Sequence, residues 1–391
     1  MSRGRMKGIT VLSYDYPPLE GGISRLCAEI VKVFHAENAD INAISIQRDV
    51  KGAAFAAPDV DEVRVSSKRG IGDLHLLWTL FTQYRQRIVI AGVWYPEGLL
   101  AALAGCKNLV VLVHGNEVMQ GKPSLKNRLL NRLRVFTLKR AKLVISNSEY
   151  TANLVRSQVP EAHVAVAKLG VDHMRFQPAT PEQKAQAKAK LGLREDQKVI
   201  LTTSRVQSYK AHDTVLRGLS KTLNTLSAKE RDGLVYLVAG RGEHLPSLQS
   251  LAIELGIENN VKWLGFVQES QLPALYQSAD LFVLCTREET DAKKVEGFGL
   301  VFLEAQACGV PVVGTAQGGI PDALCTQSGG WLIQRDDDDH LSQILLALWQ
   351  SPSAFIEAGH SARLRVEREA TWQHYSQRVK ACLDSQFGEQ A

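Results

Sequence analysis

Long apolar runs are missing from this 391-residue sequence. No stretch approaches the roughly 18 uncharged apolar residues that a membrane-spanning helix needs. The apolar run at residues 8–14 is too short for the core of a signal peptide and is typical of a first β-strand. These features predict a cytoplasmic protein, whose contact with a membrane would be peripheral and on the inner face.

Cysteine is scarce and scattered. The chain has six cysteines, and no two of them have the CxxC spacing of redox and zinc pairs. We therefore expect reduced thiols that fill core space. Acid triplets and histidine pairs with metal-ligand spacing are also missing, so the sequence predicts neither a metal site nor a bound cofactor.

Repeats and low-complexity tracts are missing as well, and the length fits two domains. The formal net charge of +5 is unevenly spread: residues 1–180 hold 24 Lys and Arg against 15 Asp and Glu, a net of +9, and the remainder has a net of −4. A basic first half predicts contact with something anionic. We expect no nucleic acid among the partners.

Short apolar runs alternate with longer amphipathic segments through the first half of the chain. Five of the runs are expected to be strands, at residues 8–14, 41–46, 88–94, 109–115 and 142–148. The segments between them have the length and periodicity of helices. This alternation is typical of a parallel sheet covered by helices on both faces.

The alternation pauses at residues 167–198, where Pro178 and Pro181 precede a helix rich in Lys, Ala and Gln. That composition suits a linker and a surface helix. Six further strands are expected at residues 199–205, 235–240, 261–266, 280–285, 311–316 and 330–334. We predict an α/β protein with Rossmann-like domains at 1–175 and 176–370. Its ligand would bind in a cleft at the carboxyl ends of the strands.

Three loops at the ends of predicted strands are glycine-rich or cationic. Gly21 and Gly22 follow the first strand, and paired glycines let the backbone approach an anion at a helix N-terminus. Arg205 and Lys210 are cations of different reach, which suits a diphosphate. Taken alone, the paired glycines are equally consistent with an ordinary tight turn. Two basic residues on a loop, taken alone, are typical of a solvated surface. Gly240-Arg241-Gly242 does not complete a dinucleotide fingerprint and indicates a tight turn.

The segment from Glu296 to Glu304 is the most informative. Gly297 and Gly299 are expected to open a helix, whose free N–H groups would point at a ligand. Glu304 lies inside that helix within an apolar run, where a carboxylate needs hydrogen-bond donors such as ribose hydroxyls. The alternative is a capping acid followed by a glutamate with no joint role.

Taken together, these motifs resemble glycosyltransferase family 4, which has the GT-B fold of two Rossmann-like domains facing across a cleft. The resemblance runs through Gly21-Gly22, His114-Gly115, Leu169–Phe176, Ser204-Arg205, Lys210, Gly240–Gly242, Glu296, Glu304 and Gly318-Gly319. Residues 170–182 and 295–314 are similar to bacterial mannosyltransferases of phosphatidylinositol mannoside synthesis. The motifs are specific for the family and far less specific for donor or acceptor.

The resemblance implies a role for each matching residue. Arg205 and Lys210 would bind the donor diphosphate, and the Gly21-Gly22 loop would complete the phosphate site. Glu304 would hold the ribose of the nucleotide. Glu296 would contact hydroxyls of the transferred sugar.

Further roles follow from the same resemblance. The backbone N–H groups of Gly297, Phe298, Gly299 and Leu300 would lie along the sugar and the phosphate. His114 would lie beside the sugar with its ring or carbonyl at the reacting centre, and Asp15 would orient the acceptor. Residues 371–391 would form a helix that crosses back to the first domain. The segment Arg287–Lys294 departs from its counterpart in those mannosyltransferases, which leaves the donor open.

The implied reaction is a metal-independent hexosyl transfer with retention, in which the departing phosphate accepts the proton of the acceptor. The expected donor is GDP-mannose and the acceptor a hydroxyl of a glycan or lipid-linked molecule, in bacterial polysaccharide or glycolipid synthesis. UDP-glucose, UDP-galactose, UDP-GlcNAc or UDP-glucuronate as donor, or a sugar-nucleotide epimerase, are the alternatives. A binding protein or a phosphorylase has less support, because a signal peptide and a lysine-bound cofactor signal are missing.

A glycosidase is disfavoured on spacing. If Glu296 and Glu304 shared a helix, eight residues would separate them by about 12 Å along its axis. The two carboxyl groups of a retaining glycosidase lie roughly 5–5.5 Å apart.

Residues 122–142 carry eight Lys and Arg and no acid. An apolar stripe runs through Leu125, Leu129, Leu130, Leu133 and Phe136. We expect an amphipathic helix that packs on the first sheet by this stripe and leaves its cations in solvent. Such a basic face would favour peripheral contact with anionic lipid.

Overall fold

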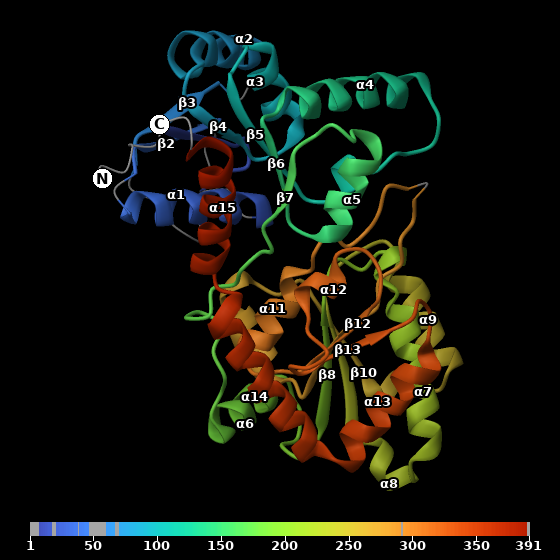
Figure 1. Ribbon diagram of the computed structural model, residues 1–391. Helices are drawn as coiled ribbons and strands as arrows, with labels where there is room; N and C mark the ends of the chain where they lie inside the picture. Colours follow the sequence, from blue (N-terminus) through green and yellow to red (C-terminus); the bar gives the residue numbers. More distant parts are fainter. Residues whose placement is uncertain are drawn as a thin grey trace. The chain divides into compact units, whose positions relative to one another are not determined.

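The computed structural model describes residues 8–17, 21–37, 39–46, 60–66, 70–290 and 292–388. The chain divides into two compact units (Figure 1). The first contains Met1–Lys168, Thr290–Lys293 and Trp372–Ala391, and the second contains Leu169–Glu289 and Lys294–Thr371. The first unit is therefore assembled from segments that are far apart in the sequence.

The first unit is built on a parallel seven-stranded sheet with the order β3-β2-β1-β4-β5-β6-β7. Its strands are β1 Ile9–Leu12, β2 Ile41–Ile46, β3 Glu62–Val65, β4 Ile88–Ala91, β5 Asn108–Val113, β6 Leu143–Ser146 and β7 Val164–Val166. All five predicted strands are confirmed, and β3 and β7 were not predicted. The central strands β1, β4 and β5 are buried along their whole length, as expected for a parallel sheet between two helical layers.

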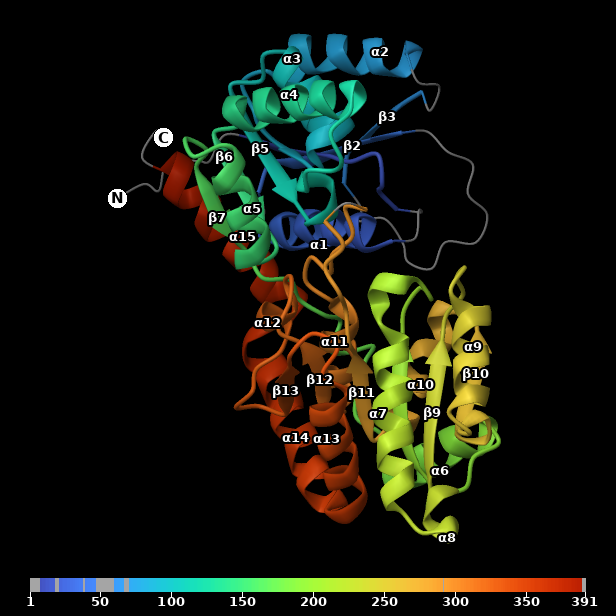
Figure 2. The ribbon, with the colours of Figure 1, turned by 90° about the vertical axis from the view of Figure 1, so that its right-hand side faces the viewer.

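Helices cover both faces of this sheet. The described helices of the unit are α1 Gly22–Ala36, α2 Ile71–Thr79, α3 Leu99–Leu103, α4 Leu125–Arg140, α5 Glu149–Gln158 and α15 Trp372–Phe387. In both ribbon views α2, α3 and α4 lie together on one face, and α1 and α15 lie on the other (Figures 1 and 2). Ser376 on α15 donates a hydrogen bond to the Glu29 carbonyl on α1 at 3.3 Å.

The orientation of α4 differs from the prediction. Leu125, Leu129 and Phe136 are 84%, 59% and 39% exposed, so most of the predicted apolar stripe lies in solvent. The buried residues of the helix are Arg134, Thr137 and Leu138. The periodicity was misleading because Arg134, counted among the solvated cations, finds hydrogen-bond acceptors inside the unit.

The second unit repeats the plan with a parallel six-stranded sheet in the order β10-β9-β8-β11-β12-β13. Its strands are β8 Lys198–Thr203, β9 Leu234–Ala239, β10 Val261–Gly265, β11 Leu281–Leu284, β12 Val312–Thr315 and β13 Gly330–Ile333. All six were predicted. The two sheets confirm the expected α/β class with two Rossmann-like domains.

The helices of the second unit alternate with its strands. They are α6 Pro181–Lys190, α7 His212–Thr225, α8 Ala228–Arg231, α9 Leu245–Glu254, α10 Leu272–Ser278, α11 Leu300–Ala307, α12 Ile320–Ala323, α13 Asp338–Gln350 and α14 Pro352–Glu369. Helix α6 begins where the linker was predicted to continue as a surface helix. Among the described residues, no helix is both long and apolar enough to span a bilayer.

Candidate functional site

Arg205 and Lys210 lie in the loop at the carboxyl end of β8, and the structure places them in different electrostatic states. The Arg205 guanidinium is exposed and has no ion-pair or hydrogen-bond partner among the described residues. The Lys210 side chain is only 10% exposed, and its Nζ lies 2.6 Å from Oε2 of Glu296. Two residues that are 86 positions apart in the sequence thus form a largely buried ion pair.

The electrostatics of Lys210 follow from that pair. Burial by itself would lower the pKa of the ammonium, but the adjacent Glu296 carboxylate outweighs it and the pKa lies above its ordinary value. The lysine is therefore a permanent cation at this strand end. A diphosphate placed here would meet one exposed and one buried positive charge.

The Gly240-Arg241-Gly242 turn after β9 supports the Arg205 loop. Val206 N donates to the Arg241 carbonyl at 2.9 Å. At Gly240, with φ of +148°, a Cβ atom would lie 1.8 Å from the Ser204 carbonyl oxygen. A glycine is required because the two turns approach this closely, so the motif has a definite function in holding the cationic loop.

A buried hydrogen-bond chain begins directly behind the same loop. Ser204 Oγ lies 3.0 Å from Nε2 of His212, and Nδ1 of His212 lies 3.1 Å from the Tyr236 hydroxyl. Tyr236 donates to Thr202 at 2.9 Å, and Thr202 donates to the Val283 carbonyl. Because the Tyr236 proton is already used, His212 must donate from Nδ1 and accept at Nε2.

His212 is fully buried, and burial followed by repulsion from Lys210 lowers its pKa from 6.5 to about 3. The ring is therefore neutral at physiological pH. Sequence reasoning missed this histidine; its position two residues after Lys210 was the available signal.

Helix α11 begins as predicted, with Gly299 as its N-cap at φ +94°. The Phe298 side chain is 3% exposed, so what this residue can offer a ligand is its backbone. Glu304 Oε2 accepts a 2.7 Å hydrogen bond from the Tyr276 hydroxyl, which also lies 2.7 Å from Thr203 Oγ1. Tyr276 thereby orients the carboxylate predicted to hold the ribose, and it is a second residue that sequence reasoning missed.

The helical spacing used against a glycosidase does not hold. Because α11 starts at Leu300, Glu296 lies outside the helix and the 12 Å estimate does not apply to it. A different observation now disfavours a glycosidase: the Glu296 carboxylate is occupied by its ion pair with Lys210.

In the first unit, His114 lies in the turn after β5. Its ring Nε2 is 2.7 Å from the Gly92 carbonyl oxygen, so Nε2 must carry a proton. The Asn147 side chain donates to the His114 carbonyl at 3.1 Å. The Glu117 carboxylate accepts from the backbone N–H groups of His114 and Gly115 at 2.5 and 3.3 Å.

The loop after β1 contains Asp15, Gly21 and Gly22, which are all exposed. Gly21 has φ of +151° and caps α1, and a Cβ atom on it would meet nothing within 4 Å. No atom of the described residues therefore crowds this side of Gly21. Residues 18–20 of the predicted glycine loop lie outside the described residues.

Arg287, at the start of the segment that departs from the mannosyltransferase pattern, is turned toward α7. It contacts Asp213 at 2.7 Å and Asp336 at 2.5 Å. Its backbone N–H donates to the Tyr209 carbonyl at 2.7 Å. These contacts assign Arg287 to holding the Lys210 loop, while sensing of sugar or acceptor by the rest of the segment stays a prediction.

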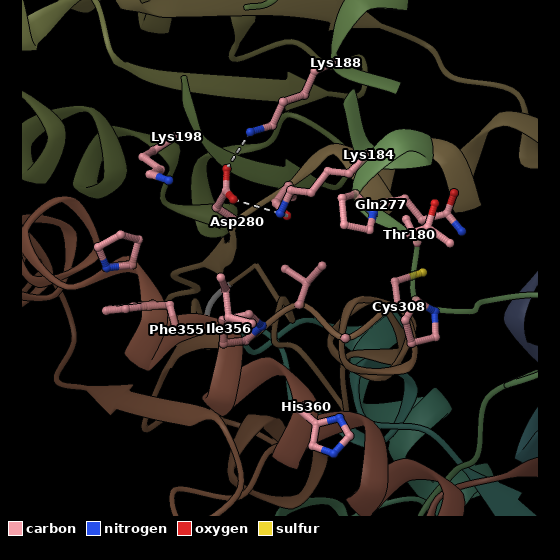
Figure 3. A pocket seen from close by; sticks show the side chains of 18 of the residues that line it. Thr180, Lys184, Lys188, Lys198, Gln277, Asp280, Cys308, Phe355, Ile356 and His360 are labelled. Carbon is pink, nitrogen blue, oxygen red and sulfur yellow. Dashed lines mark hydrogen bonds and ion pairs between the residues drawn. The ribbon is translucent and has the colours of Figure 1, made fainter. Parts of the chain in front are cut away.

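A cavity of about 460 Å³ lies at the amino ends of strands of the second sheet, opposite to the loops described above (Figure 3). It is lined near the beginnings of β8 and β11 by Lys198 and Asp280, and by apolar residues of α14. Asp280 pairs with Lys184 and Lys188 at 2.7 and 3.2 Å. Ligands of open α/β sheets bind at the carboxyl ends of the strands, so this cavity is not the predicted donor site.

Comparison with known proteins finds family matches over most of the chain. Residues 183–364 match the family described as "Glycosyl transferases group 1", and residues 20–175 match "Glycosyltransferase Family 4". A GDP-mannose-dependent monoacylated alpha-(1-6)-phosphatidylinositol monomannoside mannosyltransferase of Corynebacterium glutamicum is 28% identical over 96% of this chain and 97% of its own length. A GDP-mannose-dependent alpha-(1-6)-phosphatidylinositol monomannoside mannosyltransferase of Mycolicibacterium smegmatis is 31% identical over 68% of this chain and 67% of its own.

Solved structures give the same architecture. Anabaena HepE in complex with UDP has a TM-score of 0.76 at 19% identity, covering 97% of this chain and 100% of HepE. A sucrose-phosphate synthase of Thermosynechococcus elongatus has a TM-score of 0.74 at 18% identity, covering 98% of this chain and 100% of the synthase. At these identities the likeness establishes the GT-B fold and no more.

Proposed function

We propose that this chain, which belongs to glycosyltransferase family 4, transfers a hexose with retention from a nucleotide sugar to a hydroxyl of a glycan or lipid-linked acceptor. The observation that carries the proposal is the Lys210–Glu296 pair beside the exposed Arg205, at the strand ends where the fold binds ligands. Mannose from GDP-mannose is the proposed donor, because the relatives from Corynebacterium and Mycolicibacterium are named for that donor.

Charge development at the anomeric bond gives these residues their roles. Cleavage builds negative charge on the leaving diphosphate, which Arg205 and Lys210 stabilise more strongly than they stabilise the intact donor. The backbone N–H groups at the start of α11 add to this stabilisation. We propose that these fixed charges replace a metal ion and that no further cofactor takes part. The departing phosphate then accepts the proton of the acceptor hydroxyl.

The Lys210–Glu296 pair also predicts what donor binding changes. A diphosphate supplies Lys210 with a second anionic partner. The Glu296 carboxylate is then no longer needed to balance the charge of the buried ammonium. Its carboxylate can then accept hydrogen bonds from hydroxyls of the transferred sugar. Tyr276 keeps the Glu304 carboxylate oriented toward the ribose through its 2.7 Å hydrogen bond.

In the first unit, we propose that His114 acts at the transferred sugar through its ring or its backbone carbonyl. The Nε2 contact to Gly92 fixes the ring, and the Asn147 amide holds the carbonyl. Gly21 and Gly22 present the α1 N-terminus to phosphate, and the exposed Asp15 is the proposed acceptor-orienting residue.

A lipid-linked acceptor would require peripheral contact with the cytosolic face of a membrane. The exposed cations of α4 are joined on the same face of the sheet by α2 (Figures 1 and 2). The exposed large apolar side chains of α2 and the residues that follow it are Ile71, Leu74, Trp78 and Phe81. Their spacing places them on one side of a helix, with Trp78 68% exposed. Exposed apolar side chains on the same face as exposed cations suit an anionic lipid interface.

The test is a panel of GDP-mannose and UDP-sugars, scored by thermal stabilisation and then by product analysis. A donor at 100 times its dissociation constant adds about 2.7 kcal/mol to the unfolding free energy. We expect GDP-mannose to stabilise most, and NMR of the product to show the anomeric configuration of the donor. A product formed without acceptor would indicate an epimerase, and stabilisation by a UDP-sugar alone would overturn the donor assignment.

A further inference from the structure

Arg134 differs from the other cations of α4 in its surroundings. Lys126, Arg128 and Arg132 are exposed, whereas Arg134 is 4% exposed. Burying a guanidinium is costly unless its N–H groups find acceptors. The position must therefore be held by specific contacts inside the unit.

Those contacts converge on one short segment, residues 117–119. The NH1 group of Arg134 donates to the carbonyls of Glu117 and Met119 at 3.3 and 3.1 Å. The NH2 group donates to the side-chain oxygen of Gln158 at 2.5 Å, and Gln158 in turn donates to the Val118 carbonyl at 2.9 Å. Three consecutive backbone carbonyls are thus held by one arginine and the glutamine it orients.

The same segment controls the turn that contains His114. The Glu117 carboxylate accepts from the backbone N–H groups of His114 and Gly115 at 2.5 and 3.3 Å. Gly115 has φ of +127°, a conformation that side-chain-bearing residues rarely adopt, so this turn needs support from its surroundings. Trp94 adds a 2.9 Å hydrogen bond from its ring N–H to the Glu117 carbonyl.

We propose that Arg134 is a positioning residue for His114, acting through the backbone of residues 117–119 and the Glu117 carboxylate. This inference rests on the proposed function, in which His114 serves the transfer. The planar fork of the guanidinium reaches two carbonyls and two side-chain oxygens at once, which a lysine with a single charged nitrogen cannot reproduce. If this position only had to be filled, an apolar side chain would fill it without the cost of burying a charge. That cost is real for Arg134, because its Nε has no hydrogen-bond partner among the described residues.

The matched comparison is Arg134→Met against Arg132→Met, because both remove one positive charge from α4 and the second is exposed. We expect Arg134→Met to lower kcat by roughly 10- to 100-fold, as misplacement of a reacting group does. Its affinity for nucleoside diphosphate should change less than about twofold, because the Arg134 contacts described above involve none of the proposed nucleotide-binding residues. With a water-soluble acceptor and no vesicles, so that membrane contact does not contribute, Arg132→Met should keep both values.

A spectroscopic measurement follows His114 itself. In the wild-type protein, ¹⁵N NMR of the labelled imidazole should report a proton on Nε2, since this nitrogen faces the Gly92 carbonyl. Arg134→Met should shift this signal or add the other tautomer, and Arg132→Met should leave it unchanged. Arg134→Lys should recover little, because it cannot hold both carbonyls.

Gln158→Leu provides a second variant if Arg134→Met does not fold. It removes the Val118 contact without leaving a charge unpaired, and should change the His114 signal and kcat in the same direction by a smaller factor. Unchanged His114 signals and kcat in a folded Arg134 or Gln158 variant would overturn the proposal. If instead His114→Ala transfers at the wild-type rate, the role of His114 in the proposed function fails, while the effect of Arg134 on the His114 signal still tests positioning.

Discussion

The two units have similar parallel sheets, but they differ in where their charged side chains lie and in how far those side chains are buried. In the second unit, three polar contacts at the strand ends join Lys210 with Glu296, Tyr276 with Glu304, and His212 with Ser204, and Arg205 is the exposed exception. In the first unit, most cations of α4 are exposed, and the segment that forms the helix contains no acid. Paired, buried charges suit a small ligand of fixed geometry, whereas an exposed basic and apolar face suits an extended surface.

The largest expected effect tests the strand-end cations of the second unit. Arg205→Ala and Lys210→Ala should each lower the transfer rate by roughly 10²–10³-fold, the scale for losing one group that stabilises developing charge. Both should also weaken binding of nucleoside diphosphate. Steady-state kinetics and calorimetric titration are the measurements.

The two variants should differ in stability, which serves as the control. Lys210→Ala leaves the Glu296 carboxylate largely buried without its partner, so its unfolding free energy should fall. Arg205→Ala removes an exposed group and should unfold like the wild type. A transfer rate near the wild-type value in Arg205→Ala would mean that the diphosphate lies elsewhere.

A smaller effect should separate the two glutamates. Glu304→Gln should weaken nucleoside-diphosphate binding by about 1.5–3 kcal/mol, the value of a hydrogen bond to a charged group, because the ribose is present in donor and spent nucleotide. Glu296→Gln should leave that affinity almost unchanged and lower the transfer rate, because the spent nucleotide lacks the sugar. Equal losses of nucleotide affinity in both variants would contradict the placement of the sugar.

The next effect is a pH dependence of stability that arises from His212. Its pKa is lowered from 6.5 to about 3 in the folded protein, so below pH 6.5 the unfolded chain binds a proton that the folded chain refuses. The stability present above pH 6.5 is therefore lost as pH falls toward 3, by about 1.4 kcal/mol per pH unit from this group. Urea unfolding of the wild type and His212→Gln between pH 7 and 4 measures it. The stability difference between the two proteins should shrink with acidity, and a constant difference would count against a neutral, buried His212.

The smallest expected effect tests the exposed half of the comparison. The protein should sediment with anionic vesicles more than with neutral ones, and added salt should reduce the difference. Replacing Lys126 or Arg128 by Gln should weaken this binding by about 1 kcal/mol each. Trp78→Ser should weaken it in a way that salt affects little. Equal sedimentation with neutral and anionic vesicles at low salt would rule out this membrane contact.

Much of the fold could be predicted because the strands are buried on both faces and read as apolar runs. The strands that were missed are edge strands: β3 alternates polar and apolar residues over Glu62–Val65, and β7 has three half-buried residues. Edge strands bury less apolar surface, so the pattern that marks a strand is weaker there.

The sequence predicted which residues belong to the candidate site, but it did not predict the contacts between them. Lys210 and Glu296 were identified as ligand residues, whereas their ion pair joins segments 86 residues apart and leaves no local signal. Arg134 was misplaced for the same reason. Helical periodicity assigns a cation to solvent, and the carbonyls that receive Arg134 belong to the preceding loop. Long-range polar partners are what the sequence pattern does not encode.

Helix α15 has a consequence for biosynthesis. It packs on α1, and its residues Trp372, Tyr375, Val379 and Leu383 are buried. About 200 residues separate it from Lys168, and ribosomes need roughly 10–40 s to add that number. During this interval the nascent first unit exposes the apolar surface that α15 later covers. The unit that emerges first is thus completed only after α15 is synthesised.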